Sequence, residues 1–512
     1  MLVKTYAAAL QGISATIVTV EVNCSKGIQY YLVGLPDVAV KESHERIVSA
    51  LQESGYKFPR NRIVINMAPA DIRKEGSSYD LPLAVGVLAG AELISADRLS
   101  SFMLMGELSM DGSLKPIKGA LPIAIKARED GFKGFILPRQ NAREAAVVDG
   151  LEVYGATSLK EVIDFIDGKS VMEPTVVDTR REFYDRQDVF DCDFSDVRGQ
   201  ENVKRAMEVA AAGGHNLIMV GPPGSGKSML AKRLPTILPP FTLQESLETT
   251  KIHSVAGKMS GETSLIARRP FRSPHHTISN VAMVGGGGFP QPGEISLAHN
   301  GILFLDELPE FNRNVLEVMR QPLEDRCINI SRARFSVSYP ASFMLVASMN
   351  PCPCGYYNHP ERPCVCTPAA VQRYMSRVSG PLLDRIDIQI EITPVPFEKI
   401  SERTPAEPSS AIRERVIRAR AIQEERFAGE EGIYCNAQMN SRLLHQYAVP
   451  DNAGLAILKT AMQRLNLSAR AYDRILKVSR TIADLDGSGH IEVRHLAEAI
   501  QYRSLDRENW GL

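Results

Sequence analysis

The chain has 512 residues, of which 44% are hydrophobic and 23% are charged, and its formal net charge is -1. This length exceeds what one hydrophobic core supports, so about three domains of ordinary size are expected. The near-zero net charge excludes a protein that binds polyanions through its whole surface, because any attraction for phosphate must come from local patches.

The first 22 residues are mildly apolar, but polar residues interrupt them before the core of a signal peptide could form. Elsewhere no apolar run approaches the roughly 20 residues that span a bilayer. We therefore expect a cytoplasmic protein that makes no contact with a membrane.

Residues 1–168 alternate strand-like and helix-like segments, which predicts a mixed α/β domain. The polar stretch 169–195 has no clear period and is predicted to be a linker. The expected strands are 15–22, 29–33, 62–67 and 135–137, and the expected helices are 38–53, 81–91 and 119–129.

The rest of the chain divides into two further predicted domains. Residues 196–396 show strand–loop–helix units, which predict a parallel sheet wound with helices, and the overall fold class is therefore α/β. Residues 397–512 are predicted to be helical throughout. Segments 410–427 and 453–465 are amphipathic, and 491–502 is another helix candidate.

A phosphate-binding loop follows the apolar strand 215–220, and a helical pattern comes directly after it. In such a loop, glycines let successive backbone N–H groups converge on phosphates, while a lysine adds a cation and a serine supplies a Mg²⁺ ligand. The eight residues predicted to bind ATP are Gly221, Pro222, Pro223, Gly224, Ser225, Gly226, Lys227 and Ser228.

A pair of acids, Asp306 and Glu307, ends a second apolar strand about 80 residues downstream. We expect Asp306 to hold Mg²⁺ through water and Glu307 to polarise the water that attacks the γ-phosphate. Another strand, 343–348, leads to Asn350, which either positions that water or merely caps a turn. Together these motifs predict an ATPase that uses ATP and Mg²⁺.

Three longer stretches resemble the YifB/ComM family of magnesium-chelatase-like AAA+ ATPases: RPFRSPHHTIS from Arg269, PGEISLAHNGILFLDEL from Pro292 and SGPLLDRIDIQIEI from Ser379. The resemblance covers nearly the whole chain and implies an AAA+ domain with a helical lid. It also implies that Arg385 is the arginine finger for a neighbouring subunit and that Arg470 is the lid sensor arginine; each could instead form a surface ion pair. A finger that acts on a neighbour implies a ring, and we expect a homo-hexamer.

Residues 106–138, preceded by KEGSSYDLPLAV, resemble the proteolytic domain of Lon proteases, which use a Ser/Lys dyad. Ser78 falls at the position of the nucleophile, but Leu121 occupies the position of the activating lysine. Because a serine without a base is a poor nucleophile, we expect a domain that is not proteolytic and acts as a scaffold or substrate guide. A dyad rebuilt with Lys115 or Lys118 is the alternative.

Two basic segments are candidates for contact with DNA. The segment 251–300 places arginines beside a run of glycines, and these arginines either hold phosphates or brace a subunit interface. The segment 329–338 is predicted to be a hairpin similar to the pore hairpins of MCM-type replicative helicases, although a solvated hairpin without a partner would have the same pattern. The candidate residues are Arg268, Arg269, Arg272, Arg332 and Arg334.

Four cysteines form a C-x-C-x₉-C-x-C pattern: Cys352, Cys354, Cys364 and Cys366. Four thiolates close a tetrahedral shell, so a structural Zn²⁺ is the expected occupant. Reduced thiols or a redox response are the alternatives, and His359 is a possible substitute ligand.

The family resemblance implies a ring-shaped ATPase that moves along single-stranded, duplex or branched DNA. Its most specific form is a branch-migration helicase that acts in recombination during natural transformation. The alternatives are a magnesium-chelatase-type motor and a protein-remodelling ATPase that does not act on DNA.

Overall fold

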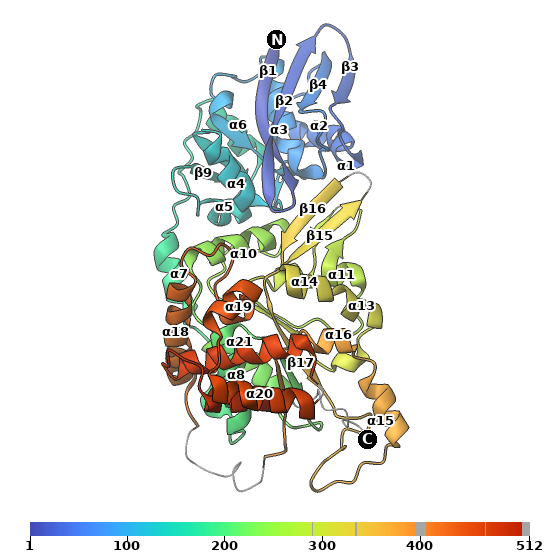
Figure 1. Ribbon diagram of the computed structural model, residues 1–512. Coiled ribbons are helices and arrows are strands. Elements are labelled where there is room, and N and C mark those ends of the chain that lie inside the picture. Colours follow the sequence, from blue (N-terminus) through green and yellow to red (C-terminus); the bar gives the residue numbers. More distant parts are fainter. Residues whose placement is uncertain (289, 333–334, 396–405, 466, 504–512) are drawn as a thin grey trace.

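The computed structural model describes residues 1–288, 290–332, 335–395, 406–465 and 467–503. The amino-terminal domain lies at one end of an elongated molecule, the central part carries a parallel sheet, and the carboxy-terminal helices pack against the central part (Figure 1). The predicted α/β class is confirmed.

The amino-terminal domain is built on a seven-stranded mixed sheet with the order β3-β4-β2-β1-β5-β8-β9. Alternate residues of β2 and β4 are buried valines and isoleucines, because successive side chains of a strand point to opposite faces. All four predicted strands are found, whereas the sequence pattern does not predict β1. The strands are β1 (Leu2–Gln11), β2 (Ser14–Ser25), β3 (Gln29–Val33), β4 (Arg62–Ala68), β5 (Phe102–Leu104), β8 (Gly134–Pro138) and β9 (Glu152–Ala156).

The predicted helices of this domain are also found, with one difference. The helix expected over 38–53 is divided at Glu42 into two helices, the first of which begins where the side chain of Asp37 accepts a hydrogen bond from the backbone of Val40. The helices are α1 (Val38–Lys41), α2 (Ser43–Glu53), α3 (Asp80–Gly90), α4 (Ala120–Glu129), α5 (Arg139–Ala145) and α6 (Leu159–Ile166).

The predicted linker contains a helix, α7 (Thr179–Gln187), which begins after the side-chain cap of Asp178. Only two of its nine residues are buried, so its sequence lacks the helical period of an amphipathic helix. One of them, Phe183, packs with Phe241 and Ala267 of the central part. The linker is therefore partly helical and docks on the central domain.

The central domain contains a five-stranded parallel sheet with the order β11-β14-β17-β10-β18. Its inner strands are entirely buried, as expected for a parallel sheet with both faces covered. The carboxyl ends of β10, β14 and β17 meet at one edge, and the three ATPase motifs follow these strands. The strands are β10 (Leu217–Val220), β11 (Phe271–Arg272), β14 (Ile302–Leu305), β17 (Met344–Met349) and β18 (Ile388–Glu391).

The helices of the central domain include α8 (Glu201–Gly213), α9 (Lys227–Arg233), α10 (Leu243–Val255), α13 (Arg313–Val318), α14 (Arg320–Asp325), α15 (Pro368–Met375) and α16 (Gly380–Leu383). The backbone N–H of Gly119, which precedes α4, donates to the carbonyl oxygen of Ser254 in α10 over 3.0 Å. This hydrogen bond links the amino-terminal domain to the central domain.

Two hairpins extend from the central domain. The predicted hairpin is present as β15 (Cys327–Arg332) and β16 (Phe335–Pro340), and a shorter one pairs β12 (Gly285–Gly286) with β13 (Gln291–Pro292). The Tyr339 hydroxyl of β16 donates to the carbonyl oxygen of Pro290 over 2.7 Å, so the two hairpins are joined. The longer hairpin points toward the amino-terminal domain (Figure 1).

The described carboxy-terminal part is helical, and its three predicted helical segments correspond to α18, α20 and α22. Residues 397–405, 466 and 504–512 of the predicted helical region lie outside the described residues. None of the helices in the described residues is both long and apolar enough to cross a bilayer. The helices are α18 (Ser409–Arg426), α19 (Ser441–Tyr447), α20 (Asn452–Arg464), α21 (Ala469–Leu485) and α22 (Val493–Gln501).

Candidate active site

The loop between β10 and α9 has a backbone that only glycines adopt easily. Gly224 and Gly226 have φ angles of 79° and 87°, in the left-handed region. At Gly221 a Cβ atom would lie 2.6 Å from the carbonyl oxygen of Ile392, so a side chain has no room there. The loop leads into the amino terminus of α9, where backbone N–H groups favour an anion.

The predicted cation of this loop, Lys227, is buried. Its Nζ atom donates to the carbonyl oxygens of Gly221 and Pro222 over 2.7 and 2.8 Å and to Oδ1 of Asn350 over 3.2 Å. Burial lowers the pKa of the Lys227 ammonium, and the nearby carboxylates of Asp306 and Glu307 oppose this effect. The structure therefore brings Asn350 together with the loop.

The two acids at the end of β14 have different surroundings. The Ser228 hydroxyl donates to Oδ2 of Asp306 over 2.6 Å, and the Ser348 hydroxyl donates to Oδ1. A serine hydroxyl and a carboxylate are oxygen ligands of the kind that Mg²⁺ prefers, so these residues fit the predicted metal. The sequence analysis missed Ser348, although its position on β17, beside the acidic strand, was the available signal.

Glu307 adopts a φ angle of 54°, which is uncommon for a residue other than glycine. Its side chain is 58% exposed, and Nδ1 of His276 lies 3.8 Å from Oε2. Asp306 is thus held by hydroxyl groups, whereas Glu307 is accessible. This difference suits a metal ligand and a group that orients water.

The amide of Gln200 is a further part of the site that the sequence analysis missed. Its Nε2 atom donates to the carbonyl oxygen of Ser225 over 2.9 Å, and Oε1 is buried without a hydrogen-bond partner in the described structure. Gln200 also has a left-handed backbone, with a φ angle of 58°. The residue supports the phosphate-binding loop from the start of α8.

The two arginines expected to act on nucleotide lie close together, outside this loop. Arg385 is only 6% exposed, and its Nη2 atom lies 2.7 Å from Oε1 of Glu324. Arg470 is exposed, and its Nη1 atom lies 3.9 Å from Oδ2 of Asp384, the residue that precedes Arg385. No hydrogen bond or ion pair within the described ranges connects either arginine to the phosphate-binding loop.

The four predicted cysteine ligands converge. Their Sγ atoms all lie within 4.8 Å of one another. The distances are 3.3 Å between Cys352 and Cys354, 3.5 Å between Cys354 and Cys364, and 3.7 Å between Cys352 and Cys364. A tetrahedral Zn²⁺ with Zn–S bonds of about 2.3 Å requires sulfur atoms about 3.8 Å apart, so the cluster with Cys366 fits this metal.

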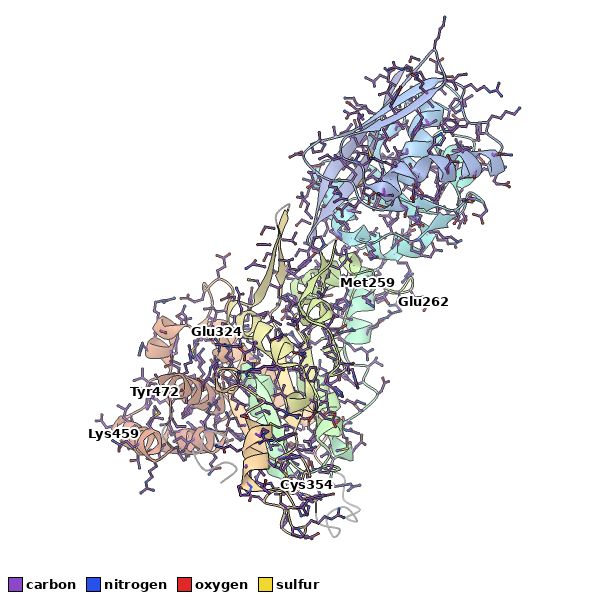
Figure 2. The ribbon with its side chains drawn as sticks, turned by 90° about the vertical axis from the view of Figure 1, so that its right-hand side faces the viewer. Met259, Glu262, Glu324, Cys354, Lys459 and Tyr472 are labelled. Carbon is purple, nitrogen blue, oxygen red and sulfur yellow. The ribbon has the colours of Figure 1, made fainter. Side chains whose placement is uncertain are left out.

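The cysteine loop follows Asn350 directly and lies against the phosphate-binding loop. A Cβ atom on Gly355 would lie 2.5 Å from Cδ of Pro223. Burial opposes ionisation of the Cys354 thiol, but hydrogen bonds from the backbone and from neighbouring thiols lower its pKa to about 6. His359 is not part of the cluster, and its Nδ1 atom accepts hydrogen bonds from the backbone of its own turn. Cys354 lies at the end of the molecule opposite the amino-terminal domain (Figure 2).

The basic residues of the 251–300 segment differ in availability. Arg269 binds both carboxylate oxygens of Glu245 over 3.0 Å and lies over the ring of Phe241. Arg272 binds both oxygens of Glu294 over 2.6 and 2.7 Å. These two side chains pair with carboxylates, whereas Arg268 is exposed and its Nη1 atom donates to the backbone carbonyl oxygen of Val189.

The hairpin candidates lie at the end of β15. Arg332 is the last residue of that strand, opposite Phe335 of β16, and Arg334 lies outside the described residues. A Cβ atom on Gly12, in the β1–β2 turn, would lie 2.8 Å from Cγ1 of Val337. The β15–β16 hairpin therefore contacts the amino-terminal domain through residues near the tip of the hairpin.

In the Lon-like region, Leu121 is fully buried in α4, and its backbone N–H donates to Glu144. The Lys118 side chain packs against Gly257 of the ATPase domain, and Lys115 is exposed in a short strand. Across the described part of the chain, no hydrogen bond joins the Ser78 hydroxyl to a lysine. The structure gives no support to a rebuilt dyad.

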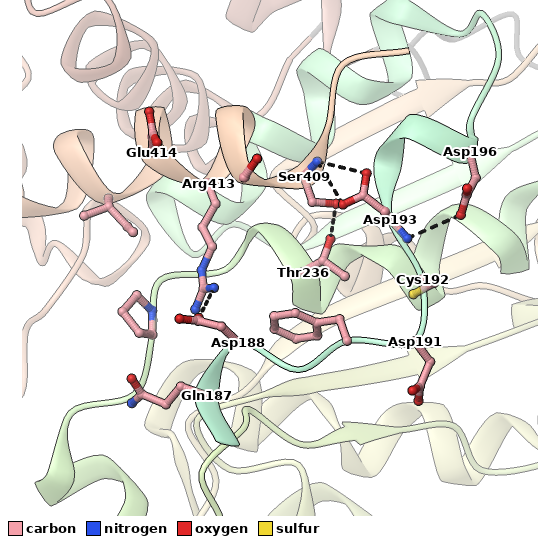
Figure 3. A pocket seen from close by; sticks show the side chains of 14 residues that line it. Gln187, Asp188, Asp191, Cys192, Asp193, Asp196, Thr236, Ser409, Arg413 and Glu414 are labelled. Atoms are coloured by element: carbon pink, nitrogen blue, oxygen red, sulfur yellow. Dashed lines mark hydrogen bonds and ion pairs between the residues drawn. The ribbon is translucent and has the colours of Figure 1, made fainter. Parts of the chain in front are cut away.

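A separate pocket lies between the linker and α18 (Figure 3). The Ser409 and Thr236 hydroxyls are 2.8 Å apart, the backbone N–H of Ser409 donates to Asp193, and Arg413 pairs with Asp188. The pocket is rich in acids, which repel phosphate, so we do not assign it to the nucleotide. Its other acidic residues are Asp191, Asp196 and Glu414.

The chain matches known protein families along most of its length. Three family models match the chain: "Magnesium chelatase, subunit ChlI" over residues 193–400, "Subunit ChlI of Mg-chelatase" over 20–141, and "Magnesium chelatase, subunit ChlI C-terminal" over 406–503. The chain is 44% identical to the protein YifB of Escherichia coli over 507 residues, which cover 98% of this chain and 96% of YifB.

Two further relatives extend the comparison. The competence protein ComM of Haemophilus influenzae is 43% identical over 506 residues, which cover 98% of this chain and 97% of ComM. Lon protease 2 of Bacillus subtilis is 31% identical over 127 residues, which cover 25% of this chain and 22% of the protease.

Proposed function

Because this chain belongs to the YifB/ComM family of magnesium-chelatase-like AAA+ ATPases, we propose that it forms a ring that couples ATP hydrolysis to movement along DNA. The name of the Haemophilus influenzae relative, a competence protein, supports a role in the uptake or recombination of DNA. We therefore assign to this chain a branch-migration helicase activity in natural transformation. The observation that carries the proposal is the meeting of the phosphate-binding loop, the acidic pair and Asn350 at one sheet edge.

In this proposal the residues of one chain bind and orient ATP. Lys227 and the loop backbone bind phosphate oxygens, and Ser228 with Asp306 holds Mg²⁺, which when bound neutralises phosphate charge. The accessible carboxylate of Glu307 orients the attacking water and accepts its proton. Asn350, whose amide lies 3.2 Å from Lys227, positions the same water.

The placement of Arg385 and Arg470 supports a ring. Arg470 pairs with Asp384, the residue before Arg385, and within the described ranges neither arginine has a hydrogen bond or ion pair to the phosphate-binding loop of its own chain. We assign both to the nucleotide of a neighbouring subunit, where a guanidinium stabilises developing phosphate charge. The ring is proposed to be a homo-hexamer.

Mixed rings of two inactive variants test whether Arg385 acts on the nucleotide of a neighbouring subunit. Arg385→Ala subunits keep an intact loop, and Lys227→Ala subunits keep an intact finger. Each variant alone should lose at least about 100-fold in turnover. An equimolar mixture should regain a measurable part of it, because some interfaces then combine an intact loop with an intact finger. Absence of any recovery in assembled mixed rings would argue against action on a neighbour.

For contact with DNA we propose the hairpin residues Arg332 and Arg334, with Arg268 as a further contact. Arg269 and Arg272 instead brace the ATPase domain through Glu245 and Glu294. The hairpin lies between the ATPase domain and the amino-terminal domain, so a DNA strand bound there would contact both.

We further propose one structural Zn²⁺, held by Cys352, Cys354, Cys364 and Cys366. Four thiolates leave no open coordination position for catalysis, so the ion stiffens the loop that follows Asn350.

The test of the whole proposal measures ATPase rate and ring assembly with single-stranded, duplex and four-way-junction DNA at low and moderate salt. We expect DNA to stimulate hydrolysis and its binding to weaken steeply as salt rises. The double variant Arg332→Ala/Arg334→Ala should lose the stimulation and retain the DNA-free rate. Indifference to all three DNAs, together with stimulation by an unfolded polypeptide, would favour a protein-remodelling ATPase. Insertion of magnesium into a porphyrin would favour a chelatase motor.

A further inference from the structure

The proposed finger, Arg385, is held inside its own chain. Besides the 2.7 Å contact with Glu324, its Nη1 atom donates to the carbonyl oxygen of Pro381 over 2.7 Å. The guanidinium therefore has two partners within one chain, although a finger must leave these partners to reach a neighbour's phosphate.

The backbone around Arg385 is fixed independently of its side chain. The carbonyl oxygen of Arg385 accepts a hydrogen bond from Nδ2 of Asn216 over 3.0 Å, and the backbone N–H of Asn216 donates to Asp387. Asp387 also pairs with Arg474 of α21 over 3.0 Å. Movement of the guanidinium consequently requires only rotation of its side chain.

The contact with Glu324 is of a kind that a phosphate can replace. Glu324 is 46% exposed, so water screens its attraction for the guanidinium. The Nε atom of Arg385 is buried and has no hydrogen-bond partner within the described residues, so one donor of the group is unsatisfied. A triphosphate offers more negative charge and several acceptors, which favours transfer of the guanidinium.

Glu324 also lies where movement of the Arg385 guanidinium can affect the β15–β16 hairpin. It is in the last turn of α14, and the helix ends at Arg326, whose φ angle of 54° turns the chain into β15. The carbonyl oxygen of Arg326 accepts a hydrogen bond from Ala341, directly after β16. Glu324 therefore lies at the base of the β15–β16 hairpin, and Figure 2 shows it between that hairpin and the carboxy-terminal helices.

We propose that Glu324 is a positioning residue that holds Arg385 within its own protomer and, when the guanidinium moves to a neighbour's triphosphate, transmits the change to the β15–β16 hairpin. This inference rests on the proposed function, since it takes Arg385 as the finger and the hairpin as the DNA contact. It adds a direct connection between hydrolysis at one site and movement of the hairpin of the adjacent protomer.

The test compares full-length assembled rings with and without four-way-junction DNA. Glu324→Gln removes the charge that restrains Arg385, so the DNA-free turnover number should rise about threefold to fivefold, as loss of a partly exposed pair permits. The ratio of the rates with and without DNA should fall by a similar factor. The double variant Glu324→Gln/Arg385→Ala should behave as Arg385→Ala, because the effect acts through the arginine. Glu324→Asp, which keeps the carboxylate, should stay within about twofold of the wild type.

Glu317→Gln is the matched control, because Glu317 on α13 makes a 2.7 Å pair with Arg320 and no contact with Arg385. Hydrogen exchange of residues 327–332 provides a second measurement. In the wild type, a slowly hydrolysed ATP analogue should change this exchange, and in Glu324→Gln the change should be absent.

The outcomes separate this inference from the proposal beneath it. If Arg385→Ala keeps full turnover, the finger assignment fails, whatever Glu324 does. If Arg385→Ala is inactive but Glu324→Gln matches Glu317→Gln in rate, DNA response and hydrogen exchange, the positioning role of Glu324 is overturned. The assignment of Arg385 as the arginine finger is then retained. A fall in both turnover and melting temperature in Glu324→Gln would make the pair a structural brace and would also overturn the inference.

Discussion

The Ser228 hydroxyl donates to a carboxylate oxygen of Asp306 over 2.6 Å, so the loop that follows β10 is joined to the end of β14. The other carboxylate oxygen of Asp306 accepts a hydrogen bond from Ser348 on β17. Three neighbouring strands thus orient one carboxylate, and two oxygen ligands suited to Mg²⁺ lie side by side.

Replacement of each of the two adjacent acids by its amide should impair a different step, Mg·ATP binding in one variant and turnover in the other. Asp306→Asn removes a metal ligand, so we expect the affinity for Mg·ATP to fall by at least about tenfold. Glu307→Gln keeps the metal ligands and removes the base, so ATP should bind normally while turnover falls by about 100-fold or more. Fluorescent-nucleotide binding and steady-state ATPase assays separate the two effects. Equal loss of ATP affinity in both variants would contradict these separate roles.

Replacement of Lys227 by alanine should abolish turnover without unfolding the protein. The ammonium is buried against carbonyl oxygens and burial lowers its pKa, so its removal takes away a costly buried cation along with the phosphate contact. We expect at least about 100-fold loss of turnover and a melting temperature equal to or above that of the wild type. Lys232→Ala, an exposed change on the same helix, is the matched control. A large drop in melting temperature for Lys227→Ala alone would refute the prediction.

The sequence predicts the strands that precede the phosphate-binding loop and the acidic pair, because phosphate binding requires fixed residue types at fixed spacing beside an apolar strand. The residues that contact the motif side chains have no such fixed spacing in the sequence. Ser348 meets Asp306 only because β17 pairs with β14, and Glu324 meets Arg385 across about 60 residues of chain. The burial of Arg385 cannot be predicted from the residues next to it in the sequence, because this burial depends on where α14 packs.

The cysteine cluster should bind one Zn²⁺ per chain. Cys354→Ser/Cys364→Ser removes two of four thiolates, so purified protein should lose the metal and melt several degrees lower. Since Gly355 contacts Pro223, we also expect weaker ATP binding in this variant. Elemental analysis by mass spectrometry measures the metal. Cys192→Ser is the control, since Cys192 lies outside the cluster. Wild-type protein without zinc after expression in zinc-supplemented medium would contradict the assignment.

The last prediction concerns stability at alkaline pH and Lys477 on α21. Burial and the nearby charge of Arg474 lower the pKa of this ammonium from 10.5 to about 8. Between these two values the unfolded chain binds more protons than the folded chain, so this lysine makes the free energy of unfolding rise with pH. Below about pH 8 both states are protonated, and its full destabilising effect is present.

Lys477→Met should remove that slope. Relative to the variant, the wild type should gain about 2 kcal/mol in free energy of unfolding between about pH 7 and about pH 9.5. Urea unfolding at both pH values measures the difference. Lys459→Met, at an exposed position of α20, controls for loss of a lysine in the same part of the molecule and should follow the wild type. If Lys477→Met and the wild type change in parallel, the buried ammonium titrates as an ordinary lysine, and the prediction is wrong.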